Sequence, residues 1–365
     1  MLHLTLLATS SATPTVSSAT PKVLPTVLIA ESGEFAASLK AELKTSWNVV
    51  HCSGNCTSHD PSSVIAVVGR ASALDLASLV SLKLVQGASY FHTDGGAVPA
   101  HAAICNTAGF WPAQGVDQIA EWAIAALFNN QYQLGASGAA FRACAFESDA
   151  PSGCASASAA TNHTMVSDLT IGILGFGRIG TRVAQMAAAV GSTVVATKRH
   201  GPFVPPPKPL KWISSDNDRL YREADVIVIT VPGTGHKETQ GMINATSLSL
   251  MKPNAIIIPV SAGPINFSDL EAALRARPSM TAVIDVWPQG CWHYPNVTCG
   301  APLGEKNWPA SPTLGALPNV LPLPGASMRD ARFWDWSVTF AARNLDALSR
   351  GEPLQGVVRN ATDEK

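Results

Sequence analysis

Three glycines mark a candidate nucleotide-binding turn. The apolar run TIGIL leads directly into Gly175-Phe176-Gly177-Arg178-Ile179-Gly180, and the helical pattern TRVAQMAAAVG and a second apolar run, TVVAT, follow. In such a strand, turn and helix unit the first glycine makes the tight turn, the second lets backbone N–H groups approach a pyrophosphate, and the third lets helix and strand pack closely. The phosphates would lie at the helix N-terminus. These six residues therefore predict a dinucleotide site.

The residues at the end of TVVAT bear on which dinucleotide is bound. An NAD enzyme places a carboxylate there to accept hydrogen bonds from the ribose hydroxyls, whereas this chain has Lys198 and Arg199. A carboxylate repels a 2′-phosphate, and Lys and Arg pair with it. We therefore expect NADPH to be preferred, with NAD as the alternative cofactor. The alternative interpretation is that both side chains are only solvated charges on a loop.

Alternating strand and helix patterns supply the frame for this turn. From Thr26 the apolar runs TVLIA, NVVHC, IAVVG and LKLVQ are separated by helical patterns near Glu34 to Lys44 and Leu74 to Leu82. From Leu169 a second and more regular series continues to NVLPLP. Strands that alternate with helices favour parallel sheets with crossover helices. The sequence thus predicts an α/β protein with two Rossmann-like domains, each a doubly wound parallel sheet.

The expected domain boundaries follow from composition. Residues 1–25 are rich in Ser, Thr and Ala and read as an N-terminal extension or targeting segment. Residues 115–133 are predicted to form a connecting helix. Residues 134–167 are rich in Ala, Ser and Gly and are predicted to be a low-complexity insertion without regular structure. The segment that ends at Gly351 and Pro353 is predicted to be an amphipathic helix that returns to the first domain. A flavodoxin-like substrate domain is expected over residues 26–114 together with 328–365. A dinucleotide-binding domain is expected over residues 115–327.

Composition narrows the class of partner. The 365 residues are 46% hydrophobic and carry a formal net charge of −1, so they offer no broad basic field for nucleic acid or an anionic membrane. The sequence contains no stretch of about 18 consecutive apolar residues, so it predicts no transmembrane helix. The nine His and seven Cys show no ligand spacing, so we expect no metal. A small-molecule partner is the remaining expectation.

The compartment is left open between alternatives. The N-terminal segment is compatible with a cytoplasmic or organellar protein. Six N-x-S/T sequons would also suit a secreted glycoprotein with disulfides, and they start at Asn55, Asn162, Asn244, Asn266, Asn296 and Asn360. Such matches arise easily in a chain rich in Ser and Thr, and Asn244 and Asn266 fall within the expected cofactor domain. Secretion is therefore kept as the less favoured alternative.

Collinear motifs identify a family resemblance. The chain resembles the D-isomer-specific 2-hydroxyacid dehydrogenases, because seven of its segments occur in the order found in that family. They are LKLVQGASYF, ICNTAGFWPAQGVDQIAEWAIAALF, ILGFGRIG, the long segment from DVIVITV to SAGPIN, VIDVW, LPNVLPLPGAS and ARNLDALSRGEPLQGVV. The resemblance implies hydride transfer between a nicotinamide and a small 2-oxo or 2-hydroxy acid, and a homodimer. It also adds Val231, Pro232, Ser261 and Asp285 to the expected cofactor-binding residues.

The same resemblance reveals substitutions at the positions that should do the chemistry. The family uses an Arg to hold the substrate, and a His assisted by a Glu to supply the proton. The matching positions here are Ala262, Gly290 and Gly325. The catalytic residues are thus unknown, and His293 and Arg329 are the candidates for relocated chemistry. Two hypotheses follow: a 2-oxo acid reductase with rewired catalysis, or a catalytically inactive nucleotide-binding sensor or scaffold.

Overall fold

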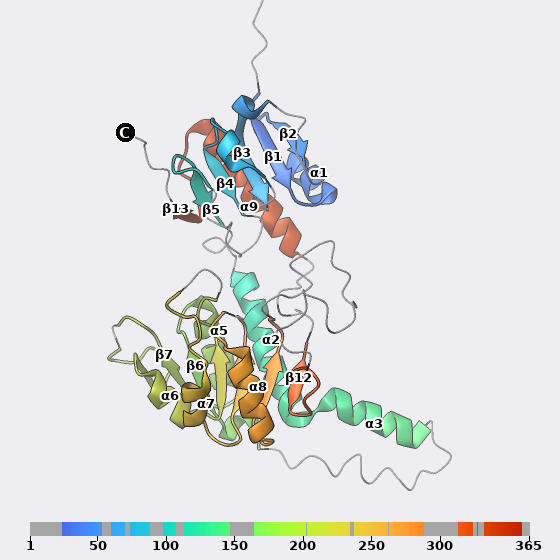
Figure 1. Ribbon diagram of the computed structural model, residues 1–365, viewed down its shortest axis with the longest axis vertical. Helices are drawn as coiled ribbons and strands as arrows, with labels where there is room; N and C mark the ends of the chain where they lie inside the picture. Colours follow the sequence, from blue (N-terminus) through green and yellow to red (C-terminus); the bar gives the residue numbers. More distant parts are fainter. Residues whose placement is uncertain are drawn as a thin grey trace, which may run out of the picture.

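The computed structural model describes two α/β units. Its described residues are 24–52, 60–69, 74–87, 98–106, 113–146, 164–201, 203–233, 237–261, 263–287, 313–323, 327 and 332–359. Within these ranges two separate sheets are found, one in each half of the molecule (Figure 1). The expected fold class is thereby confirmed, whereas the exact domain boundaries stay a prediction.

The first sheet has six strands. They are β1 (Thr26–Ala30), β2 (Asn48–His51), β3 (Val64–Gly69), β4 (Leu84–Gln86), β5 (Ala103–Cys105) and β13 (Val357–Arg359), in the order β13-β5-β4-β3-β1-β2. All neighbours are parallel except β13, which runs antiparallel to β5. The last strand therefore carries the end of the chain back to the first unit.

The second sheet has seven strands, all parallel. They are β6 (Thr170–Leu174), β7 (Thr193–Thr197), β8 (Trp212–Ser214), β9 (Val226–Ile229), β10 (Ile256–Pro259), β11 (Thr281–Ile284) and β12 (Val320–Pro322), in the order β12-β11-β10-β9-β6-β7-β8. The chain reverses its direction of travel across the sheet between β6 and β9. Ligands of open α/β sheets bind outside the strand ends at such a switch point.

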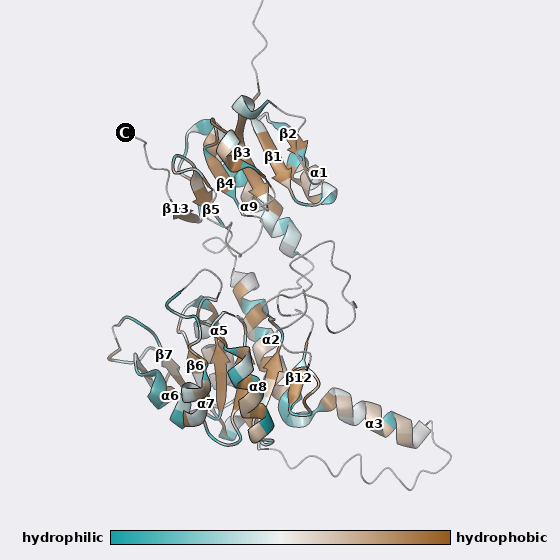
Figure 2. Cartoon of the chain, in the orientation of Figure 1, coloured by the Kyte–Doolittle hydropathy of each residue, from teal (hydrophilic) through white to brown (hydrophobic). Residues whose placement is uncertain are grey.

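Helices cover both faces of the second sheet. They are α2 (Ala113–Tyr132), α5 (Arg178–Ala189), α6 (Asn217–Glu223), α7 (Ala245–Leu250) and α8 (Phe267–Ala276). Alternate strand residues enter two cores: Ile171 and Ile173 pack with α2 and α5, and Leu174 packs with the α6, α7 and α8 side. The strands are accordingly mostly hydrophobic (Figure 2), as expected of a sheet that is buried on both faces.

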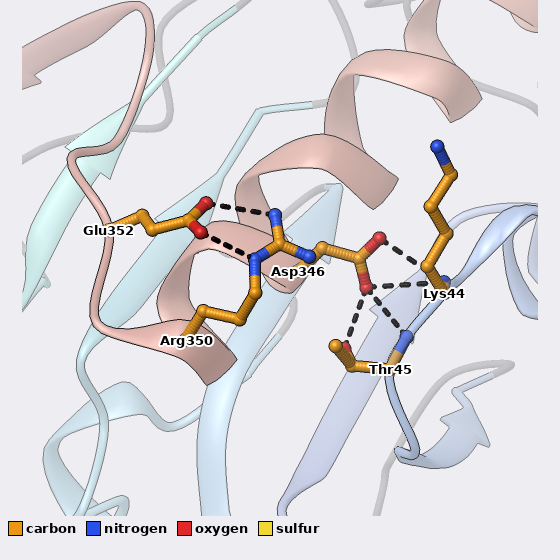
Figure 3. Close-up of polar contacts among 5 residues, drawn as sticks. All are labelled: Lys44, Thr45, Asp346, Arg350 and Glu352. Atoms are coloured by element: carbon orange, nitrogen blue, oxygen red, sulfur yellow. Dashed lines mark hydrogen bonds and ion pairs between the residues drawn. The ribbon is translucent and has the colours of Figure 1, made fainter.

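The C-terminal helix fastens the first unit, as the sequence predicted. Helix α9 (Phe333–Arg350) packs against α1 (Gly33–Glu42) and ends at Gly351, which has a φ of 69°. Asp346 of α9 is only 3% exposed and accepts hydrogen bonds from the backbone N–H groups of Lys44 and Thr45 and from the Thr45 hydroxyl (Figure 3). This carboxylate therefore ties α9 to the turn before β2.

One predicted helix is absent from the described residues, and one observed helix was not predicted. Residues 74–82 form only a 3-10 turn over Leu76–Ser78, because Leu76, Leu79 and Leu82 recur every third residue and one tight turn buries all three. The start of the segment 134–167 forms helix α3 (Leu134–Phe146), where no regular structure was expected. Its Ala residues favour a helix even without a core to pack on, and its Leu134 and Phe141 are 67% and 52% exposed.

The connecting helix was predicted within two residues at each end. Its apolar face is buried within the chain: Ile119, Ala123 and Leu127 are each 5% exposed or less. Asp117 of α2 also pairs with Arg182 of α5, with an Oδ1 to Nε distance of 2.7 Å. Packing inside the chain thus accounts for this face, and α2 is held against the helix that follows the glycine turn.

Candidate cofactor site

Each of the three glycines in the turn after β6 is glycine for a different structural reason. Gly175 has a φ of +101°, and a Cβ there would lie 2.6 Å from Val231 Cγ1. A Cβ on Gly180 would lie 2.5 Å from the Gly175 carbonyl oxygen, so this position requires glycine for close packing. A Cβ on Gly177, the N-cap of α5, would meet nothing within 4 Å. The tight turn at Gly175 and the close helix contact at Gly180 are visible, and the space in front of Gly177 is open, while the approach of a pyrophosphate there stays a prediction.

A cavity of about 640 Å³ opens in front of this turn. Nine of the twelve predicted cofactor-binding residues line it, namely Gly175, Phe176, Gly177, Arg178, Ile179, Lys198, Arg199, Val231 and Pro232. They come from the turn after β6 and from the ends of β7 and β9, which are the two neighbours of β6 in the sheet. The three loops meet because carboxyl ends of parallel strands share one edge of a sheet.

The other three predicted residues do not line the cavity. Gly180 is buried in α5. The Ser261 hydroxyl donates a hydrogen bond to the Val231 carbonyl oxygen at 2.7 Å and so holds the turn that flanks the cavity. Asp285 is fully buried and accepts a hydrogen bond from the Ser327 backbone N–H at 2.8 Å. Gly180 and Ser261 thus support the walls of the site, and the contact of all three residues with a cofactor stays a prediction.

Sequence reasoning missed several lining residues. Ser215 follows β8 and Asn217 is the first residue of α6, and Glu238, Thr239 and Met242 follow β9. The polar run SDN directly after the short strand WIS was the available signal, because β8 lies beside β7 in the sheet. Their position relative to Lys198 requires the tertiary fold, since more than a dozen residues separate them in the chain.

The charged end of the cavity contains one ion pair. Arg199 Nη2 lies 3.5 Å from Glu238 Oε1, and the two side chains are 65% and 44% exposed. Lys198 is exposed beside it. Exposed pairs of this kind are weak, typically below about 1 kcal/mol, so a phosphate with two charges can compete with Glu238 for Arg199.

The residues fit a dinucleotide. Gly177 leaves the approach to the α5 N-terminus free of side-chain atoms, and unpaired N–H groups with a favourable dipole are found at a helix start. Val231 and Pro232 offer an apolar wall, and Lys198 and Arg199 supply cations at the far strand end. Backbone donors, an apolar surface and cations are the three features that a phosphorylated dinucleotide requires.

The substrate side cannot be described in the same way. Ala262, Gly290 and Gly325, and the candidates His293 and Arg329, all lie outside the described residues. Within the described ranges no group of three or more His, Cys, Asp or Glu side chains could hold a metal ion. The same part of the chain has no helix that combines the length and the apolar character needed to cross a membrane.

Comparison with known proteins supports the site. The model of the D-isomer specific 2-hydroxyacid dehydrogenase NAD binding domain matches residues 139–324. A glyoxylate reductase of Thermococcus onnurineus is 32% identical over 188 residues, which are 50% of this chain and 49% of the relative. A D-3-phosphoglycerate dehydrogenase of Synechocystis is 33% identical over 174 residues, 46% and 27% of the two chains. This chain thus spans about half the length, or less, of these curated relatives.

Solved structures show the same fold over nearly the whole chain. A 2-hydroxyacid dehydrogenase from Ketogulonicigenium vulgare has a TM-score of 0.69 at 20% identity and covers 93% of this chain and 99% of its own. An NADPH-dependent glyoxylate/hydroxypyruvate reductase from Sinorhizobium meliloti also has a TM-score of 0.69 at 20% identity, with 92% and 98% covered. The family model, the cofactor cavity and the shared fold agree: this chain belongs to the family of D-isomer specific 2-hydroxyacid dehydrogenases, which are NAD(P)-dependent.

Proposed function

We propose that this chain binds NADP(H) at the turn after β6 and reduces a small 2-oxo acid by hydride transfer. The observation that carries the proposal is the open approach at Gly177 in front of the α5 N-terminus, between Gly175 and Gly180, which both need to be glycine. A pyrophosphate at this point accepts backbone hydrogen bonds and gains from the helix dipole. The nicotinamide then extends toward Val231 and Pro232.

The preference for NADP(H) rests on charge. Lys198 and Arg199 both line the cavity at the end of β7, where a carboxylate would be needed to select NAD. A 2′-phosphate would exchange the Glu238 partner of Arg199 for a stronger one. NAD lacks this group and would leave the Arg199–Glu238 pair intact, so it is the weaker of the two cofactors.

Catalysis by this chain would have to be rewired. Hydride addition to a 2-oxo acid produces an alkoxide that must receive a proton, and the substrate carboxylate needs a cation. With Ala262, Gly290 and Gly325 at the positions of the family's Arg, Glu and His, these tasks fall to other side chains. His293 as proton donor and Arg329 as carboxylate ligand are the candidates within the chain.

The same three positions favour a second candidate function. A chain without a proton donor and a substrate cation would bind the dinucleotide and not turn it over. Such a protein would act as a nucleotide-binding sensor or scaffold. The two functions share the cofactor site and differ only in whether the bound dinucleotide transfers its hydride.

One titration separates the two functions. NADPH and NADH are each added to the protein while nicotinamide fluorescence is followed, and glyoxylate, hydroxypyruvate and pyruvate are then added to the same sample. Tight NADPH binding followed by loss of fluorescence supports the reductase, and binding without loss supports the sensor. Absence of binding would remove the basis of both.

A homodimer is also proposed, on the family resemblance. The apolar face of α2 is used within the chain, so it does not supply the contact. The exposed apolar side chain of Leu134, at the start of α3, is a candidate contact. Light scattering of the purified chain tests the dimer, and a Leu134→Asp variant is expected to shift it toward the monomer.

A further inference from the structure

The cysteines divide into two chemical states. Cys52 and Cys144 are disulfide-bonded. Cys105 is the third described cysteine, and it is free and buried in strand β5. Disulfides form and persist in oxidising compartments and are rare in the cytosol. Two bonded cysteines on opposite halves of the molecule therefore indicate that the chain folds in an oxidising compartment, where N-x-S/T sequons are also modified.

Two of the six sequons lie in the described part, at neighbouring helix starts. Asn244 is the N-cap of α7 and Asn266 is the N-cap of α8. The two helices lie side by side on one face of the second sheet (Figure 1), and the Asn266 backbone N–H donates to the Ile243 carbonyl oxygen. Both sequons thus share one region of the surface, and their side chains can be compared directly.

The Asn266 side chain is free to carry a large group. Asn266 and Ser268, the two sequon residues that a transferase must recognise, are exposed, while Phe267 between them is 7% exposed and enters the core. The Asn266 Oδ1 accepts a hydrogen bond from the Asp269 backbone N–H at 3.3 Å. Its Nδ2 has no hydrogen-bond partner among the described residues. The cap therefore uses the oxygen and leaves the nitrogen to solvent.

Both polar atoms of the Asn244 side chain are hydrogen-bonded within the chain. It is half-buried, and its Nδ2 donates to the Gly241 carbonyl oxygen at 2.8 Å. Its Oδ1 accepts from the backbone N–H groups of Thr246 and Ser247 at 3.0 and 3.1 Å in a reciprocal capping box. A sugar on this nitrogen would have to fit into a turn that the amide already fills.

We propose that Asn266 is an N-glycosylation site of a chain that folds in an oxidising, membrane-enclosed compartment, and that Asn244 stays unmodified. The donor is an oligosaccharide linked to a lipid pyrophosphate. A bond forms between Asn266 Nδ2 and the anomeric carbon, the bond from that carbon to the pyrophosphate breaks, the lipid pyrophosphate leaves with the electron pair, and Nδ2 loses one proton. The Oδ1 cap of α8 is retained, so the fold accepts the product.

The test is a site-resolved analysis of the full-length chain from a eukaryotic cell line. The purified protein is treated with peptide N-glycosidase in heavy-oxygen water and digested, and the peptides are identified by mass spectrometry. Asn266 should be recovered as Asp with a heavy oxygen, and Asn244 as unlabelled Asn. An unlabelled Asn266 overturns the proposal wherever the chain is found in the cell, and a labelled Asn244 overturns its second half.

Matched variants separate glycosylation from other causes of the label. Ser268→Ala removes the sequon hydroxyl but keeps the Asn266 cap, so the label should disappear; a label that persists would reflect deamidation and refute the site. Thr246→Ala makes the same change at Asn244 and should alter nothing. Because Cys52 is buried, alkylation is done in denaturant, where Cys52 should react only after reduction, and a Cys52 that is alkylated in denaturant without reduction would overturn the oxidising compartment.

Discussion

The glycine turn allows two matched substitutions with opposite expected effects. Gly177→Ala places a methyl group in open space at a residue with a φ of −99°, which alanine adopts readily. The loss of an N-cap glycine costs up to about 1 kcal/mol, and the lower entropy of the unfolded chain offsets about 0.4–1 kcal/mol of it. The melting temperature should therefore change by at most about 4 °C.

Cofactor binding should respond much more strongly in this variant. The methyl group lies where a pyrophosphate approaches the N–H groups of α5. Each hydrogen bond to a charged group contributes about 1.5–3 kcal/mol, so the loss of two of them would weaken NADPH binding by at least about 100-fold. Fluorescence titration of NADPH measures this change.

Gly180→Ala should behave in the reverse way. Its methyl group would lie 2.5 Å from the Gly175 carbonyl oxygen and 2.9 Å from Ile173 Cγ2, and both belong to tightly packed parts of the fold. Overpacking of this kind costs about 1–3 kcal/mol, which corresponds to a fall in melting temperature of roughly 2–12 °C. A Gly177→Ala variant that keeps NADPH affinity within about threefold, or a Gly180→Ala variant with unchanged melting, would refute this account of the turn.

Three further perturbations test the cofactor end, a buried thiol and the α9 attachment. Replacing Lys198 and Arg199 together with Ala should weaken NADPH binding by about 10-fold or more in the same titration and leave NADH nearly unchanged, because only NADPH offers a phosphate there. Burial raises the pKa of the Cys105 thiol to about 12, above its value in the unfolded chain, so its stability contribution is fully present below about pH 9 and is lost as the pH rises toward 12. Urea unfolding at pH 8 to 10.5 should show this decline, and Cys105→Ala should flatten it; equal slopes would contradict the assignment. Asp346→Ala removes the acceptor of two backbone N–H groups and should destabilise the chain by about 2–4 kcal/mol in calorimetry, whereas Glu352→Gln, at an exposed pair with Arg350, should not shift the melting temperature measurably.

The sequence predicted the strand, glycine turn and helix of the candidate cofactor site because the requirement there is local. The glycines, the strand before them and the helix after them are adjacent in the chain, and backbone sterics alone select Gly175 and Gly180. Ser215 and Glu238 could not be found in this way, since the parallel strands bring distant loops to one edge. Sequence periodicity also failed at Leu76 and Leu79, where a spacing of three fits a 3-10 turn as well as a helix.

The strand order separates most of the cofactor cavity from the positions that the family resemblance assigns to catalysis. The cofactor cavity is built from the loops after β6, β7 and β9. The chain reaches Ala262, Gly290 and Gly325 after it leaves β10, β11 and β12, which are three neighbouring strands on one side of β9. None of these three strands is a neighbour of β6 in the sheet, but the segment after β10 touches the cofactor side, because Val260 packs in one cluster with Ile179 of α5 and the Ser261 hydroxyl donates to the Val231 carbonyl oxygen. Retained NADPH affinity says nothing about turnover, and only the addition of a 2-oxo acid to the loaded protein distinguishes a reductase from a sensor.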